Sequence, residues 1–142
     1  MPLEHAGPLC SAGITTYSPL ARYIKGKKDQ AVGVVGFGGL GHMAIKLDVA
    51  MGAKVTVFSA EALSATLVVY TDKEAMAKLG RSQNLIVDTV TVHHEINDLI
   101  GTLKAYTGVM TMIGGVPQPY QMNGFPMIFN GTLARASVNP RS

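Results

Sequence analysis

The stretch Ala31 to Met51, AVGVVGFGGLGHMAIKLDVAM, decides the fold of this chain. Its first five residues, Ala31 to Val35, are apolar or glycine, as expected for a strand that is buried on both faces of a parallel sheet. Four glycines follow within six residues, and apolar side chains then recur at the spacing of one helix face. These apolar positions are Leu40, Met43, Ala44, Leu47 and Met51. The stretch therefore predicts a strand, a tight turn and an amphipathic helix, in that order.

The glycines of this turn are Gly36, Gly38, Gly39 and Gly41. A pyrophosphate can reach the free N–H groups at a helix N-terminus only where no Cβ blocks the backbone. Glycine also serves turns that hold no ligand, so a purely structural turn is the alternative interpretation. Between a strand and a helix, the pattern favours a dinucleotide site. We interpret His42, in the first helical turn, as a polar residue near the helix start and not as a catalytic base.

Composition narrows the class of protein. The 142 residues are expected to form one domain, and a hydrophobic content of 47% with only 15% charged residues excludes a disordered chain. The net charge is +3, and the one tight basic cluster, Lys25 to Lys28, is too short to predict nucleic-acid binding. No apolar run is long enough for a membrane span, and the N-terminus shows no secretory signal. Cys10 is the only cysteine, which favours a reducing, cytoplasmic setting without an intrachain disulfide.

The remaining elements alternate between strands and helices. Residues 1–13 look like a loop, and a short helix is predicted from Thr15 to Ile24 with Ser18 as its cap. Further strands are predicted at Lys54 to Ser59, Leu67 to Tyr70, Leu85 to Thr89, Gly108 to Ile113 and Thr132 to Val138; helices are predicted from Asp72 to Leu79, Glu95 to Lys104 and Phe125 to Phe129. The fold class is therefore α/β, a Rossmann-type doubly wound parallel sheet with helices on both faces.

One crossover of this predicted sheet is unusually short. Only seven residues, Ala60 to Thr66, separate the second strand from the third. A right-handed parallel crossover needs at least about ten to twelve residues and normally includes a helix. We therefore expect either a local rearrangement of the sheet or a strained unit at this place.

The end of the second strand also bears on cofactor choice. A carboxylate there would accept hydrogen bonds from the adenosine ribose and repel a 2′-phosphate. The residue at this position is Ser59, which admits the phosphate. The sequence therefore favours NADP over NAD.

Two segments together carry a resemblance to a known family: PLCSAGITTYSPL, from Pro8 to Leu20, and VGVVGFGGLGHMAIK, from Val32 to Lys46. Both resemble the zinc-dependent medium-chain alcohol dehydrogenases, and among them the cinnamyl alcohol dehydrogenase group. The similarity continues through Asp88 to Val90, Met112 to Pro117 and Phe125 to Phe129, and covers nearly the whole chain. It implies that residues 1–30 are a connecting segment and residues 31–142 are the NAD(P)-binding domain of a two-domain enzyme.

The resemblance also assigns individual residues. It implies that the dinucleotide is lined by Thr15, Gly36, Gly38, Gly39, Leu40, Gly41, Ser59, Thr89, Val90, Gly114 and Ser137. Cys10 matches a ligand of the catalytic zinc whose protein partners come from a domain outside this chain, so the site is incomplete. Two departures stand out. Residues 60–63, AEAL, replace the polar and lysine residues that clasp the 2′-phosphate in the family. Ser137 does not begin the family's serine-x-isoleucine-glycine-glycine pattern, because Val138, Asn139 and Pro140 follow it.

Three functions remain open at this point. The first is the cofactor-binding portion of an NADP-dependent, zinc-type alcohol dehydrogenase that interconverts aldehydes and primary alcohols, inactive alone and with no catalytic residue of its own. The second is a non-catalytic NAD(P)-binding or dimerisation module, because the family dimerises through the last strand, here Thr132 to Val138. The third is a truncated gene product without independent function. The substrate is not encoded in these residues, and His93 and His94, at a strand-to-helix loop, are not predicted to bind metal.

Overall fold

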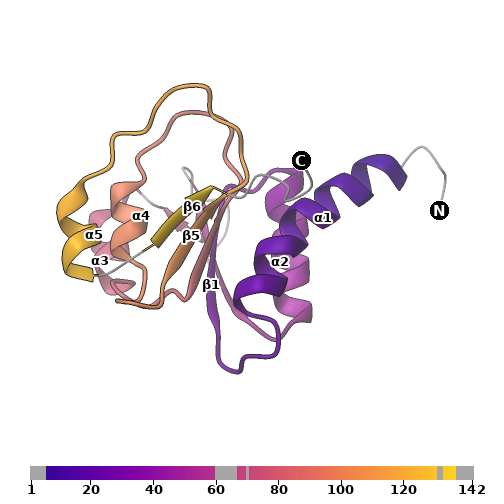
Figure 1. The fold of residues 1–142 in the computed structure, drawn as a ribbon, viewed down its shortest axis with the longest axis horizontal. Helices are drawn as coiled ribbons and strands as arrows, with labels where there is room; N and C mark the ends of the chain where they lie inside the picture. Colours follow the sequence, from indigo (N-terminus) through magenta and orange to yellow (C-terminus); the bar gives the residue numbers. More distant parts are fainter. Residues whose placement is uncertain (1–5, 60–66, 70, 131–132, 137–142) are drawn as a thin grey trace.

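Six parallel strands form one sheet in the order β3-β2-β1-β4-β5-β6 in the computed structural model, which describes residues 6–59, 67–69, 71–130 and 133–136 (Figure 1). The strands are β1 (Ala31–Val35), β2 (Lys54–Ser59), β3 (Leu67–Val69), β4 (Leu85–Asp88), β5 (Val109–Met112) and β6 (Leu133–Ala136). The chain runs outward from β1 to β3, then returns to place β4 on the other side of β1. This reversal confirms the predicted doubly wound α/β sheet, and ligands of such sheets bind beside the reversal point.

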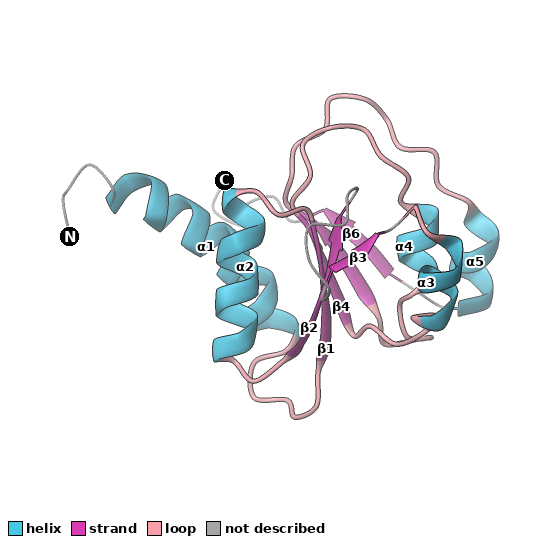
Figure 2. Cartoon of the chain, turned by 180° about the vertical axis from the view of Figure 1, so that it is seen from behind, coloured by secondary structure: helices cyan, strands magenta, loops and turns pink. Residues whose placement is uncertain are grey.

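Helices cover both faces of the sheet. In Figures 1 and 2, α1 and α2 lie on one side of the strands, and α3, α4 and α5 lie on the other. Their bounds are α1 (Ala6–Tyr23), α2 (Gly39–Ala50), α3 (Lys73–Lys78), α4 (Asn97–Gly101) and α5 (Gly124–Asn130). Two layers of helices on a parallel sheet explain why the strands are apolar on both faces.

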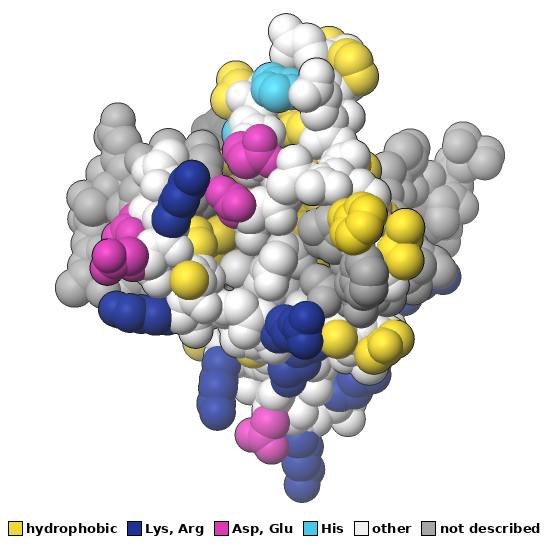
Figure 3. Space-filling model, turned by 90° about the vertical axis from the view of Figure 1, so that its left-hand side faces the viewer, with side chains coloured by type: hydrophobic (Ala, Val, Ile, Leu, Met, Phe, Trp, Pro, Cys, Tyr) yellow, Lys and Arg dark blue, Asp and Glu magenta, His cyan; other side chains and the backbone are white. Residues whose placement is uncertain are grey.

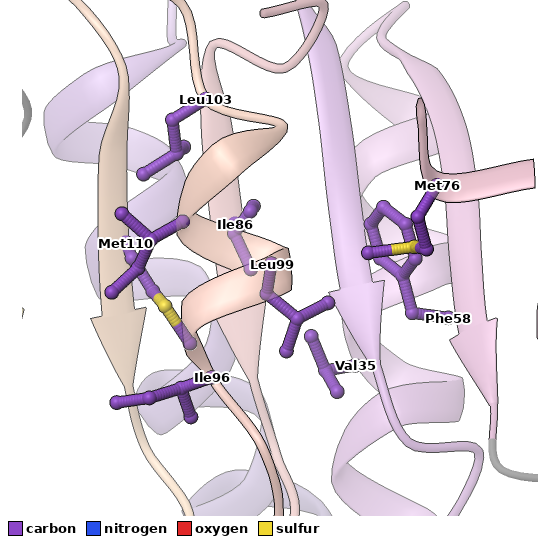
Figure 4. Packing of buried hydrophobic residues seen from close by; sticks show 9 residues of the cluster. Val35, Phe58, Met76, Ile86, Ile96, Leu99, Leu103 and Met110 are labelled. Atoms are coloured by element: carbon purple, nitrogen blue, oxygen red, sulfur yellow. The ribbon is translucent and has the colours of Figure 1, made fainter. Parts of the chain in front are cut away.

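Each face of the sheet has its own hydrophobic core. One core joins β1 and β4 to the helices α1 and α2 and contains Leu20, Ile24, Val32, Val34, Ala44, Leu85, Val87 and Val109. The other core lies under α3 and α4 and contains Val35, Phe58, Met76, Ile86, Ile96, Leu99, Ile100, Leu103 and Met110 (Figure 4). Neighbouring residues of β4 belong to opposite cores, as Leu85 and Ile86 do, because side chains alternate along a strand.

Gly33 shows how tightly the second core is packed. A Cβ at this position would lie 2.5 Å from the Phe58 ring and 3.3 Å from Ile86. The missing side chain of Gly33 therefore makes room for the Phe58 ring, which is fully buried.

The first helix differs from the sequence-based prediction. Helix α1 begins at Ala6 and not at Thr15, so residues 6–13 are helical where a loop was expected, and Ser18 lies inside the helix instead of capping it. It packs on α2 and contributes the fully buried Leu20. The proline and glycine content of residues 6–13 suggested a loop, but a proline in the first turn removes no intrahelical hydrogen bond.

The sequence-based prediction is confirmed for the cap of α3 but is wrong for the length of α4. The predicted cap of α3 is confirmed, because Oδ1 of Asp72 accepts hydrogen bonds from the N–H groups of Glu74 and Ala75 at 3.0 and 3.2 Å. Helix α4 covers only Asn97–Gly101, which is shorter than the predicted span from Glu95 to Lys104. After α4 the chain instead forms a parallel bridge between Leu103 and Gln83.

The short crossover does not change the strand order. β3 pairs in parallel with β2, with Val57 opposite Leu67 and Ser59 opposite Val69. The predicted alternative of a rearranged sheet is therefore wrong for the order of strands. Residues 60–66, which make the connection, and Tyr70 lie outside the described residues.

Charged side chains are unevenly distributed on one face of the molecule. In Figure 3, most lysine and arginine side chains lie in the lower half of the view, and most acidic side chains lie in the upper half. Among the helices described, none is both long and apolar enough to cross a membrane.

Candidate functional site

The glycine turn joins the carboxyl end of β1 to the start of α2. Gly36 has a φ of 89°, a backbone conformation that side chains with a Cβ rarely adopt, and its N–H donates to the carbonyl oxygen of Phe58 at 2.9 Å. Gly41, in the first turn of α2, packs directly against this turn. A Cβ on Gly41 would lie 2.2 Å from the carbonyl oxygen of Gly36. Gly36 and Gly41 are therefore required by the fold itself.

Gly38 and Gly39 differ from these two residues. A Cβ at either position would meet no atom within 4 Å. Gly38 is the N-cap of α2, and no side chain caps this helix end. The first intrahelical hydrogen bond runs from the N–H of His42 to the carbonyl oxygen of Gly38, at 2.9 Å. The N–H groups of the first turn thus have no acceptor within the helix, and such a helix end favours an anion.

Residues that follow β4 and β5 form the wall beside the turn. The hydroxyl of Thr89 donates to the carbonyl oxygen of Val35 at 2.8 Å, which ties the end of β4 to the end of β1. A Cβ on Gly36 would lie 2.9 Å from Val90 and 3.0 Å from the Thr89 hydroxyl. A Cβ on Gly114 would lie 2.1 Å from the carbonyl oxygen of Val90. The carboxyl ends of β1, β4 and β5 therefore meet at one place, with glycine at each close approach.

Two more predicted residues lie at the edge of this place. Ser59 is the last residue of β2 and follows Phe58, whose carbonyl oxygen holds Gly36, so it lies beside the glycine turn. Leu40 lies in the first turn of α2 and is half-buried. His42 is exposed, and its ring meets Phe37 edge to face with 6.0 Å between ring centroids.

The remaining predicted residues are Cys10, Thr15 and Ser137. Cys10 and Thr15 both lie on α1, Cys10 as an exposed free cysteine and Thr15 half-buried. Ser137 lies outside the described residues. Among the residues that the structure describes, no three His, Cys, Asp or Glu side chains are grouped closely enough to hold a metal ion.

The sequence did not reveal a buried ion pair behind the wall. Nε2 of His94 lies 3.1 Å from Oδ2 of Asp88, and both side chains are almost completely buried. The contact with Asp88 raises the pKa of His94 above its usual value, although burial opposes this shift. This pair was not predicted from the sequence, because a loop separates the two residues along the chain. The signal that could have indicated it was an acidic residue at the end of a buried strand.

No protein-family model matches the chain. Curated sequences, in contrast, match nearly all of it. The probable cinnamyl alcohol dehydrogenase 6 of Oryza sativa subsp. japonica is 39% identical over 151 residues, which cover 97% of this chain and 42% of the relative. The 8-hydroxygeraniol dehydrogenase of Catharanthus roseus is 41% identical over 148 residues, which cover 97% of this chain and 41% of the relative. The chain is homologous to one part of the cinnamyl alcohol dehydrogenases.

Solved structures agree with this relationship. A cinnamyl alcohol dehydrogenase of Sorghum bicolor superposes with a TM-score of 0.84 at 35% identity, covering 96% of this chain and 41% of the enzyme. The Helicobacter pylori cinnamyl alcohol dehydrogenase, determined in complex with NADP(H), gives a TM-score of 0.73 at 32% identity with the same coverage. These findings confirm the resemblance that the sequence carried.

Coverage sets the limit of the homology. The chain spans about 41% of the length of the relatives that it matches. The matched part contains the doubly wound sheet with its glycine turn, and so corresponds to the cofactor-binding part of these enzymes.

Proposed function

We propose that the chain binds a nicotinamide dinucleotide at the glycine turn, with NADP preferred over NAD, and that it has no dehydrogenase activity alone. The observation that carries the proposal is the difference among the four glycines. Gly36 and Gly41 are packed against protein atoms, whereas a Cβ on Gly38 or Gly39 would enter open space at an uncapped helix N-terminus. Folding alone does not require glycine at the two open positions, but close approach of a pyrophosphate does.

Each part of the site has a role in this proposal. The pyrophosphate lies on the first turn of α2, against the backbone of Gly38, Gly39 and Leu40. Thr89, Val90 and Gly114 line the nicotinamide half, and Ser59 lies beside the adenosine ribose, where it leaves room for a 2′-phosphate. When bound, the nicotinamide supplies hydride transfer, and the chain's own residues hold and orient it. The NADP(H) complex of the H. pylori relative supports this proposal.

Replacing Gly38 by valine is expected to abolish cofactor binding without loss of stability. The backbone of Gly38 is extended, with φ −78° and ψ −166°, which valine adopts readily, and its Cβ would meet no protein atom. Titration with NADPH and NADH, followed by cofactor fluorescence and by the shift in melting temperature, measures the effect. Saturable NADPH binding by the wild-type chain, weaker NADH binding and no binding by Gly38→Val is the expected result.

A matched control separates the site from the fold. Gly101 lies in α4, and a Cβ there also meets no atom within 4 Å, so Gly101→Val should bind NADPH like the wild-type chain. Equal affinity of Gly38→Val and wild type would contradict the assignment of the pyrophosphate to α2.

The catalytic zinc of the family does not fit the residues described here. Cys10 is exposed on α1, and no group of three metal-binding side chains exists among the described residues. A catalytic zinc needs three protein ligands and an open position. We therefore expect no turnover when the purified chain is supplied with NADPH, zinc and an aromatic aldehyde, measured by NADPH absorbance. Sustained NADPH oxidation that depends on the aldehyde would overturn this part of the proposal.

A second candidate function is a dimerisation module. β6 is an edge strand of the sheet and pairs only on its β5 side among the described residues. An unpaired strand edge offers hydrogen-bonding groups to a second copy of the chain.

The single cysteine is consistent with a reducing, cytoplasmic location. Roles for Thr15 and Ser137 in cofactor binding, and the division at residue 30, stay predictions.

A further inference from the structure

Asp88 occupies a central place behind the proposed cofactor site. It ends β4 and is 1% exposed. Its Oδ1 accepts a hydrogen bond from the N–H of Val90 at 3.0 Å, and its backbone carbonyl oxygen accepts from the N–H groups of Ile113 and Gly114 at 2.8 and 3.1 Å. Asp88 therefore fixes the Thr89–Val90 turn with its side chain and the start of the Gly114 loop with its backbone.

The second carboxylate oxygen of Asp88 faces His94. Oδ2 lies 3.1 Å from Nε2 of the imidazole, whose other nitrogen, Nδ1, lies 2.9 Å from the carbonyl oxygen of Val92. A carboxylate and a carbonyl oxygen can both only accept, so both ring nitrogens need a proton for both contacts to be favourable. The surroundings of His94 therefore suit an imidazolium, whose charge also offsets that of the buried carboxylate.

Tyr120 closes the arrangement from the loop after β5. Its hydroxyl lies 3.2 Å from Nδ1 of His94, and its ring meets the His94 ring edge to face, with 5.5 Å between centroids. Tyr120 also stacks on His93, with 5.3 Å between ring centroids. The contacts between Tyr120 and the buried His94 side chain thus link the loop after β5 to the loop after β4.

We propose that the Asp88–His94 ion pair, closed by Tyr120, is a positioning device that holds the Thr89–Val90 turn and Gly114 in the conformation that binds the cofactor, and that deprotonation of His94 weakens binding. The proposal rests on the proposed function, because it assigns a proton-dependent role to residues behind that site. None of the three side chains is assigned to the reaction itself.

The sign of the pH effect follows from the groups that face His94. Asp88 raises the pKa of His94 most strongly, while burial lowers it and the charge of Glu95 on the same loop raises it. Tyr120 stays neutral, because burial and the charge of Asp88 raise the pKa of its phenol. His93, stacked on Tyr120, is a further titratable neighbour. The ion pair is therefore complete below pH about 6.5 and is lost as the pH rises through the raised pKa of His94.

The test measures the NADPH dissociation constant of the 142-residue chain from pH 6.5 to 9.5. Wild-type affinity is expected to fall about fivefold across this range. The glutamine of His94→Gln cannot be protonated, so this variant should bind NADPH about fivefold more weakly than the wild type at pH 6.5. At pH 9.5 the two affinities should be equal. The ratio of variant to wild type cancels the titration of the cofactor's own 2′-phosphate, whose pKa is about 6. Tyr120→Phe retains the ion pair and should keep the pH dependence. His93→Gln removes the stacked neighbour of Tyr120 but leaves the Asp88–His94 pair, so it should also keep the pH dependence of the wild type.

Other outcomes remain informative. Parallel profiles for wild type and His94→Gln would overturn the proposal. If His94→Gln does not fold, a pH-independent affinity of the wild-type chain would overturn it equally. If the folded wild-type chain binds no NADPH, the proposed function fails separately, and amide hydrogen exchange then decides the positioning role. In that case protection at Val90 and Gly114 should fall as His94 loses its proton, and unchanged protection would exclude the device.

Discussion

Replacing Asp48 by alanine is expected to stabilise the protein by about 2 to 4 kcal/mol at pH 8. Asp48 lies in α2, is 0% exposed, and neither of its carboxylate oxygens has a hydrogen-bond partner among the described residues. Burial without a partner disfavours the charged form and raises the pKa of Asp48 from 3.8 to about 7. Alanine removes this cost and suits a helix interior better than aspartate.

The same substitution should change how stability depends on pH. The unfolded chain loses the Asp48 proton near pH 4, whereas the folded chain retains it up to about pH 7. Wild-type stability contributed by this group is therefore highest below pH 4, falls between pH 4 and 7, and is level above pH 7. The advantage of Asp48→Ala should grow through this window. Urea unfolding followed by circular dichroism at several pH values measures it.

An exposed carboxylate provides the control for Asp48. Asp98 lies on the surface of α4, and Asp98→Asn should change the free energy of unfolding by no more than about 0.5 kcal/mol at each pH. An Asp48→Ala variant that unfolds more easily than wild type at pH 8 would show that the carboxylate is stabilised in the folded chain.

Replacing Gly41 by alanine is expected to destabilise the protein by about 3 kcal/mol or more and to abolish NADPH binding with it. The added Cβ would lie 2.2 Å from the carbonyl oxygen and 3.0 Å from the carbonyl carbon of Gly36, and 3.2 Å from the hydroxyl of Thr89. The obstacle is backbone, so no side-chain rotation relieves it. The helix would have to move away from β1, whose end also carries the contact between Thr89 and Val35.

Gly39→Ala is the natural comparison for Gly41→Ala. It changes the same turn by the same single methyl group, but its Cβ would meet no atom within 4 Å. Thermal unfolding should therefore leave Gly39→Ala near the wild type and lower the melting temperature of Gly41→Ala strongly. Equal melting temperatures for the two variants would contradict the close contact between α2 and the turn.

The sequence predicted those parts of the molecule that depend on local pattern. β1, the glycine turn and α2 were predicted together, because a short apolar run, four glycines and a helical stripe follow one another directly. β2 and the Asp72 cap of α3 were predicted for the same reason. The start of α1 was missed, because its proline and glycines favour a loop when tertiary packing is not considered.

Features that depend on distant partners were not predicted. The ion pair of Asp88 and His94 with Tyr120 joins two loops, and no local pattern specifies that they meet. The buried carboxylate of Asp48 left a signal that could have been used, since it lies four residues after Ala44, on the same face of α2. Its position within the apolar stripe already implied burial of a charged group.

The packing of α1 decides where segments of this chain could be exchanged with those of its relatives. Leu20 and Ile24, at and just after the end of α1, fill the same layer as Ala44 of α2 and Val32 of β1. A junction placed at Ala31, where the first strand begins, would separate these side chains from the layer that they complete. A chimaera that keeps the sheet from one parent should therefore also take α1 from that parent. Its junction should be placed before Ala6.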